Sequence, residues 1–156
     1  MAFKINVSLK DQKVLNHALV KAGYKGQRRK FHYTVGFIDK TIPKEDAQAF
    51  GETVVKELQQ VVDNLQPFYE VEKAAHLFGC VFALLPTPVS RVKLREINLW
   101  LSNKKINLNK ETLPENYIPH LTVWHSRCID RRFQSLEQYA SHHPTYHLKQ
   151  AAYVIF

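Results

Sequence analysis

The chain alternates between segments with strand periodicity and segments with helix periodicity. Residues 3–9 carry apolar side chains at every second position, which is typical of a half-buried strand. The composition of residues 31–38 and 119–126 predicts two internal strands, and that of residues 146–156 predicts a terminal one. Strands are therefore expected along the whole length of the chain.

Two helices are predicted in the first half of the chain. Asp11 is a candidate N-cap for the first helix, and Gly23 ends it. Thr41 and Pro43 precede the second helix, whose apolar residues recur close to the 3.6-residue period until Pro67 stops it. Both helices are therefore expected to bury one face.

Two further helices are predicted in the second half. Residues 89–103 form the third helix, whose inward side chains are expected to be Val92, Ile97, Trp100 and Leu101. Asp130 is a candidate N-cap for the fourth helix, whose apolar positions are Phe133, Leu136 and Ala140. Residues 104–119 are expected to form the long loop of the chain.

A hairpin is predicted at the centre of the chain, turning near Phe78 and Gly79, because residues 68–85 are rich in aromatic and β-branched side chains. On either side of this turn the same order of elements occurs: strand, helix, strand, helix, strand. The first run covers residues 3–76 and the second about 79–155. The sequence therefore predicts one fold with two similar halves.

Length and charge bound the function. A chain of 156 residues is expected to form one domain, residues 1–156, with halves at about 1–76 and 77–156. The formal charge of +8 favours an anionic partner, with nucleic acid as the first candidate. No membrane partner is expected, because no apolar run approaches the ~20 residues that span a bilayer, and the cytoplasm is the expected location, because the N-terminus is unlike a signal peptide. A monomer is also expected. Cys80 and Cys128 match neither a disulfide framework nor a zinc pattern.

The middle strand of each half carries the same motif. His32-Tyr33-Thr34-Val35 and His120-Leu121-Thr122-Val123 are both His-x-Thr-Val, and they lie 88 residues apart. On a strand, residues i and i+2 share a face, so each motif offers an imidazole and a hydroxyl side by side. If the halves pair about a two-fold axis, both faces meet in one cleft.

Two imidazoles and two hydroxyls suit phosphoryl chemistry. A neutral histidine accepts a proton from an attacking hydroxyl or water, and a protonated one donates a proton to the leaving oxygen. Threonine hydroxyls donate hydrogen bonds to the non-bridging phosphate oxygens. No metal or cofactor is required by this scheme, so none is expected.

The paired motifs resemble those of the 2H (two-histidine) phosphoesterase superfamily. Pro119 before His120 and the turn at 77–79 are also similar to the family pattern, whereas the first motif lacks the proline and has Tyr33 at a position that is usually aliphatic. The resemblance implies an α+β, bilobal, duplicated β-α-β-α-β fold with two antiparallel sheets around a central cleft and helices outside. It implies that His32 and His120 are the catalytic acid/base pair. The phosphate-binding residues would be Thr34 and Thr122.

The family resemblance also implies the substrate class. We expect hydrolysis of 2′,3′-cyclic phosphates on RNA ends or nucleotides. The alternatives are cleavage of 2′,5′-phosphodiester bonds, cyclic phosphates derived from ADP-ribose, or a non-catalytic RNA-binding module of the same fold. The sequence does not indicate which histidine is the acid and which the base.

Rim residues are expected around the motifs. Candidates for stacking a base are Trp124 and Tyr153, and the loop residues Tyr24 and Tyr117. Arg28 and Arg127 belong to basic clusters that flank the two motifs, where they would attract an RNA end. His142, His143 and His147 are not expected to bind metal, because Pro144 breaks the helix that would align them.

Overall fold

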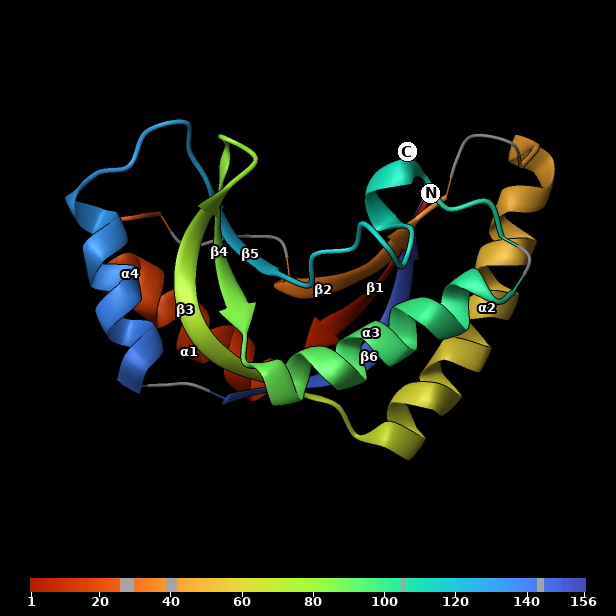
Figure 1. The fold of residues 1–156 in the computed structure, drawn as a ribbon, viewed down its shortest axis with the longest axis horizontal. Helices are drawn as coiled ribbons and strands as arrows, with labels where there is room; N and C mark the ends of the chain where they lie inside the picture. The colour runs from red at the N-terminus through yellow and green to blue at the C-terminus, as the bar shows by residue number, and fades with distance from the viewer. Residues whose placement is uncertain (26–29, 39–41, 105, 143–144) are drawn as a thin grey trace.

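The computed structural model describes residues 1–25, 30–38, 42–104, 106–142 and 145–156, and of residues 140 and 141 only the backbone. These ranges contain six strands, four α-helices and one 3-10 helix in a mixed α+β arrangement (Figure 1). The elements are β1 (Ala2–Val7), α1 (Leu9–Lys21), β2 (His32–Phe37), α2 (Lys44–Leu65), β3 (Phe68–Leu77), β4 (Val81–Pro86), α3 (Pro88–Ser102), η1 (Lys110–Thr112), β5 (Leu121–His125), α4 (Arg131–His142) and β6 (Thr145–Val154). Each predicted strand and helix has its counterpart at the expected place.

The six strands pair side by side in one closed ring rather than in the two separate sheets that were expected. Their order is β1-β2-β5-β4-β3-β6, and β6 returns to pair with β1. All pairs are antiparallel. Two of the ladders are short: β2 and β5 share one pair of partner residues, and β3 and β6 share three. These two ladders join what would otherwise be the three-stranded sets β2-β1-β6 and β5-β4-β3. Strand periodicity predicts each strand but carries no information about which edges meet.

The strand pairing is symmetric between the first three strands and the last three. When β1, β2 and β3 are exchanged for β4, β5 and β6, four pairs of the ring map onto one another, and the pairs β2–β5 and β3–β6 each map onto themselves. The helices partly follow the same rule, because α2 packs on β6 and α4 packs on β3. The antiparallel pair β2–β5 therefore joins equivalent strands of the two runs.

The start of α1 differs from the sequence prediction. Ser8, not Asp11, is the N-cap, and its hydroxyl accepts a hydrogen bond from the backbone N–H of Asp11 (3.2 Å). The Asp11 carboxylate instead lies in the first turn and accepts from the backbone N–H of His147 on β6 (2.7 Å). The prediction was wrong because strand β1 ends two residues earlier than its alternation indicated, so the helix begins at Leu9.

The other helix ends agree with the sequence. The carboxylate of Asp130 accepts from the backbone N–H of Arg132 (2.9 Å) at the start of α4, as a cap does. Helix α2 begins after Pro43 and ends at Gln66, which has a left-handed backbone (φ 44°), directly before Pro67. Thr41 and the side chain of Ala140 lie outside what the structure describes.

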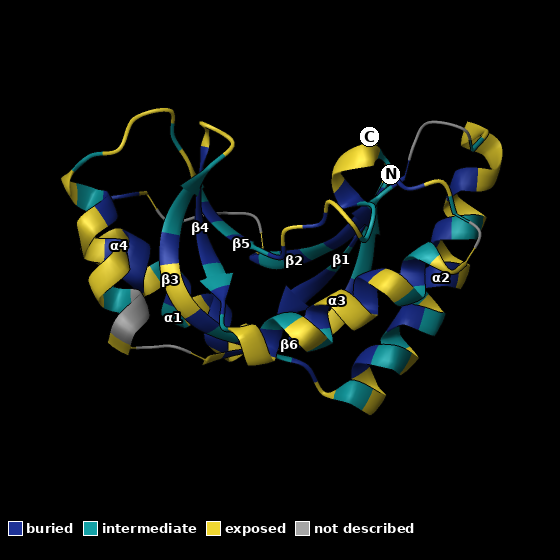
Figure 2. Cartoon of the chain, viewed as in Figure 1, coloured by how far each residue is buried: buried dark blue, intermediate teal, exposed yellow. Residues whose placement is uncertain are grey.

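The core fills the space between the strands and the inward stripes of the helices, as the dark segments of Figure 2 show. In α3 the buried stripe runs along Ser90, Leu94, Ile97, Asn98 and Leu101. Val92 was expected to face inward but is exposed, because it lies off this stripe. Among the described residues, no helix is long and apolar enough to cross a membrane.

Candidate functional site

Strands β2 and β5 bring the two histidine motifs together. Tyr33 and Leu121, the middle residues of the motifs, are antiparallel partners and are fully buried. Continuing this register by one residue places His32 opposite Thr122 and His120 opposite Thr34. These four side chains are all half-buried, whereas the residues between them are fully buried, so the four lie on the opposite face. Each histidine therefore faces the threonine of the other motif.

Both histidines are oriented by the same contact. The Nδ1 atom of His32 lies 3.0 Å from the backbone oxygen of Lys30, and Nδ1 of His120 lies 2.8 Å from that of Ile118. A carbonyl oxygen only accepts, so Nδ1 is the donor in each pair. The neutral rings then carry their lone pair on Nε2, which is the atom able to accept a proton. The match between the two anchors is independent of the sequence motif.

A pocket of about 580 Å³ opens beside the second motif. This volume is in the range of small-molecule sites. Its wall combines aromatic, apolar and polar side chains: Thr34, Phe37, Phe78, Lys110, Glu111, Thr112, Asn116, Tyr117, Ile118 and His120. Among the four motif side chains, Thr34 and His120 line the pocket. His32 and Thr122 lie on the same two strands but outside this lining.

Burial changes the protonation of His120. Desolvation lowers the pKa of its imidazole below the ordinary value, and the hydrogen bond to the Ile118 carbonyl opposes part of that shift. The rings of Phe78 and His120 meet in a T-shaped arrangement, with 5.5 Å between the ring centres. Burial therefore favours the neutral form of the His120 imidazole, which is the state of a general base.

Buried hydrogen bonds fix the far wall of the pocket to β2. The Tyr117 hydroxyl contacts both the Tyr33 hydroxyl and the backbone oxygen of Thr34. Burial raises the pKa of both tyrosines, so their hydroxyls remain protonated. Asn98 on α3 adds two bonds from its amide nitrogen, to the backbone oxygens of Val35 (2.8 Å) and Thr112 (3.0 Å). The segment around η1 is thereby held against the strand that carries His32 and Thr34.

The sequence analysis missed most of the pocket wall. Phe78 was expected at a turn that resembles the family pattern and was assigned no place in the site, although it lines the pocket beside His120. Tyr117 was expected only as a loop aromatic residue that could stack a base. The available signal for Phe78 was a phenylalanine at a turn position where asparagine or glycine is usual.

Of the predicted stacking residues, Tyr117 lines this pocket, whereas Trp124, Tyr153 and Tyr24 lie outside it. Trp124 packs against Tyr24, with 5.0 Å between the ring centres. The guanidinium of Arg132 lies over the Tyr24 ring, 4.4 Å from the ring centre. The Tyr153 ring lies against Gly51 of α2, where a Cβ atom would come within 2.7 Å of it. Neither Trp124 nor Tyr153 lines the pocket, and both side chains are half-buried in these other contacts.

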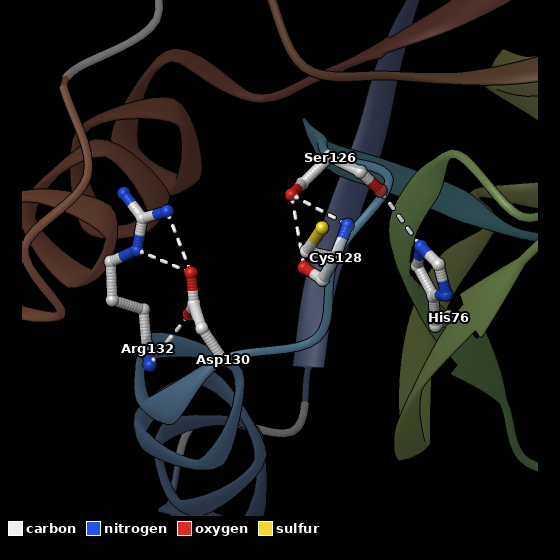
Figure 3. Close-up of polar contacts among 5 residues, drawn as sticks. All are labelled: His76, Ser126, Cys128, Asp130 and Arg132. Atoms are coloured by element: carbon white, nitrogen blue, oxygen red, sulfur yellow. Dashed lines mark hydrogen bonds and ion pairs between the residues drawn. The ribbon is translucent and has the colours of Figure 1, made fainter.

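Arg127 lies in the segment that follows β5, which Figure 3 shows in detail. The carbonyl of Ser126 accepts from Nε2 of His76 on β3 (2.7 Å), and its hydroxyl donates to the carbonyl of Cys128 (3.0 Å). Asp130 and Arg132 pair at 2.7 Å further along. Arg127 is exposed between these anchored residues. Arg28, the other predicted basic rim residue, lies outside the described ranges.

Metal ligands do not gather within the described ranges, where no group of three His, Cys, Asp or Glu side chains could hold an ion. His142 ends α4, and His147 on β6 contacts the carboxylate of Asp11 (3.3 Å). His143 lies outside the described residues. Cys80 and Cys128 are exposed free thiols.

Comparison with known proteins does not identify the chain. No family model matches it. No curated protein matches it significantly. A functional conclusion therefore depends on the two motifs and on the geometry that surrounds them.

Proposed function

We propose that this chain is a metal-independent phosphodiesterase that hydrolyses 2′,3′-cyclic phosphates on RNA ends or nucleotides. One observation carries the proposal: the two His-x-Thr strands are antiparallel partners, and both histidines have the same Nδ1 anchor. Two imidazoles held with Nε2 available for proton transfer are what general acid and base catalysis requires. Two structural histidines would have no reason to share motif, strand pair and anchor.

The reaction needs two proton transfers. A water oxygen attacks phosphorus as its proton passes to the neutral imidazole. The bond between phosphorus and the 2′ or 3′ oxygen breaks, and that oxygen takes a proton from the other imidazole, which starts as the cation. The product is a ribose phosphate monoester, and the two histidines end with exchanged protonation states. In the free protein His120, whose pKa burial lowers, suits the role of base.

The threonines and a lysine would stabilise the phosphate. Thr34 and Thr122 flank the histidines on the same face, where their hydroxyls donate to the non-bridging oxygens as charge develops. Lys110 is exposed on the pocket wall and supplies a positive charge nearby. Basic residues exceed acidic ones, 22 against 14, which supports an anionic substrate such as RNA.

We place the enzyme in the cytoplasm as a monomer.

The same features support membership of the 2H phosphoesterase superfamily and a duplicated, bilobal fold. The element order strand, helix, strand, helix, strand occurs twice. The ring of strands is unchanged when the two runs are exchanged, and equivalent strands β2 and β5 meet at the motifs. A duplication in which both copies kept their His-x-Thr strand accounts for these features together.

The test is turnover of a short RNA that ends in a 2′,3′-cyclic phosphate, with EDTA present. We expect conversion to a single monophosphate isomer, and loss of that conversion in His32→Ala and in His120→Ala. Absence of hydrolysis by the folded protein would contradict the proposal. Cleavage of 2′,5′-linked oligonucleotides instead would redirect it to that bond, and RNA binding without any turnover would indicate a binding module.

A further inference from the structure

The tip of the central hairpin has an unusual backbone. The N–H of Cys80 donates to the carbonyl of Leu77 (3.1 Å), which closes a β-turn with Phe78 and Gly79 at its centre. Both central residues have positive φ, 55° at Phe78 and 68° at Gly79, as in a type I′ turn. Such turns favour Asn-Gly, whereas a phenylalanine in the left-handed region is strained.

Burial does not offset this strain. The Phe78 side chain is 65% exposed, and a Cβ atom added at the neighbouring Gly79 would meet nothing within 4 Å. The turn therefore stands clear of the core. An exposed apolar side chain in a strained conformation contributes little to folding stability, so its position calls for another explanation.

Phe78 forms one wall of the pocket that contains His120 and Thr34. Ile118, which is 49% exposed, and Phe37 supply further apolar surface in the same pocket. Lys110, Glu111 and Asn116 add groups that can hydrogen-bond. A lining that combines aromatic and apolar side chains with polar ones suits a heteroaromatic ring more than it suits a sugar or a phosphate.

We infer that a nucleobase stacks on Phe78 in this pocket while the phosphate of the same nucleoside reaches His120 and Thr34. The inference rests on the proposed function and specifies its substrate: a phosphate ester that carries a base, on the His120 side of the site. One nucleoside fills the pocket, so a mononucleotide cyclic phosphate suffices for binding. The tip of the hairpin then acts in substrate recognition.

The experiment compares two substrates with the same reacting group. One is adenosine 2′,3′-cyclic phosphate, and the other is methyl ribofuranoside 2,3-cyclic phosphate, which has no base. We expect the wild-type kcat/KM to favour the adenosine compound at least tenfold, because base stacking on an aromatic side chain has about this effect. Phe78→Ala should reduce the preference at least fivefold, mainly through KM, and Phe78→Trp should retain it.

Two further variants separate recognition from folding. Phe78→Asn places the residue that the turn prefers, so it should unfold at a higher temperature than wild type and still lose the preference. Val89→Ala truncates an apolar side chain of similar exposure (71%) on α3 and should keep the wild-type preference. Equal preference in wild type and Phe78→Ala would overturn the inference.

Equilibrium binding distinguishes this inference from the proposed function. Adenosine 3′-monophosphate, titrated by calorimetry, should bind wild type at least fivefold more tightly than Phe78→Ala. Turnover that needs both histidines but is indifferent to Phe78 would overturn the stacking inference alone. Binding that depends on Phe78, without turnover of any cyclic phosphate, would contradict the proposed hydrolysis alone. Failure to bind the nucleotide would overturn the stacking inference.

Discussion

The two histidine motifs have the same backbone setting but different neighbours. His32 is the first residue of β2 and His120 directly precedes its partner strand β5, and each histidine contacts the carbonyl two residues before it. The buried residue between histidine and threonine differs: Tyr33 in the first motif and Leu121 in the second. The Tyr33 hydroxyl contacts Tyr117 and donates to the carbonyl of Leu94 (3.2 Å). The first strand is therefore tied to the pocket wall by side-chain hydrogen bonds, whereas the apolar side chain of Leu121 can only pack.

The segments around the motifs differ as well. The hairpin tip at Phe78 and the segment that contains η1 form a walled pocket at His120. Burial there lowers the pKa of His120. A symmetric strand pair can therefore hold two histidines in unlike surroundings, because the loops around it are not symmetric. The roles of the histidines would then be set by the loops rather than by the motifs.

Removal of either imidazole should have the largest effect. We expect His32→Ala and His120→Ala each to reduce kcat on a 2′,3′-cyclic phosphate by about 10²- to 10⁴-fold, since each removes one proton transfer. Steady-state kinetics measures this loss. His125→Ala is the matched control, because His125 is an exposed histidine on the same strand, at the other parity from His120. A similar loss in His125→Ala, or none in the other two, would refute the assignment.

Removal of the motif threonine hydroxyls should have the next-largest effect on kcat. Thr34→Val and Thr122→Val each remove a hydroxyl donor while keeping the side-chain shape, and we expect kcat to fall by about 10²-fold. Thr53→Val serves as control, because Thr53 is exposed on α2 and its hydroxyl bonds only its own helix at Ala49 (3.0 Å). Unchanged kcat in both motif variants would mean that the threonines do not contact the phosphate.

Loss of the contact between the Tyr33 and Tyr117 hydroxyls should lower the free energy of unfolding. Tyr117→Phe removes a buried hydroxyl that contacts Tyr33 and the Thr34 carbonyl, so the free energy of unfolding should fall by about 1–3 kcal/mol. Urea unfolding measures the change. In a double-mutant cycle with Tyr33→Phe, the two losses should be less than additive. Additive losses would mean that the two hydroxyls are not coupled.

The protonation of His120 should change folding stability by less than the tyrosine variants do, and its titration can be measured directly. Because burial lowers its pKa, the NMR titration midpoint of the His120 imidazole should lie below 6.5. The unfolded chain then takes up a proton at higher pH than the folded one, so this contribution to stability is present above pH 6.5 and is lost as pH falls through the folded pKa. Phe78→Ala admits water and should raise the midpoint. A wild-type midpoint above 6.5 would exclude burial as the dominant influence.

The smallest expected effect concerns the strained backbone at the hairpin tip. Phe78→Asn should raise the free energy of unfolding by about 1 kcal/mol, because asparagine tolerates positive φ better than phenylalanine does. Chemical denaturation measures the change. A destabilised variant would show that the Phe78 ring contributes more to folding than its exposure indicates.

Features that depend on residues close together in the chain were predictable from the sequence, whereas contacts between distant strands and helices were not. The strand at residues 31–38 and the turn at Phe78 follow from composition, and Asp130 was recognised as a cap, because each of these depends on neighbouring residues. The N-cap at Ser8 was missed because the strand and the helix compete for the same residues. The outward position of Val92 depends on which face of α3 the strands cover, and that is a tertiary property.

The candidate site shows the same division. Both motifs were visible in the sequence because i and i+2 share a strand face. Their pairing through Tyr33 and Leu121, and the closure of all strands into one ring, depend on contacts between residues far apart in the chain. The pocket wall was hidden for the same reason, since Asn98 and Tyr117 hold it in place across long sequence separations.

The central claim is that both histidines belong to one phosphate site. It is tested most directly by titrating the protein with adenosine 3′-monophosphate while following the imidazole resonances of His32, His120 and His125 by NMR. The account predicts that the His32 and His120 resonances shift with one shared dissociation constant while His125 does not respond. Shifts confined to one of the two motif histidines, or with unrelated dissociation constants, would contradict it.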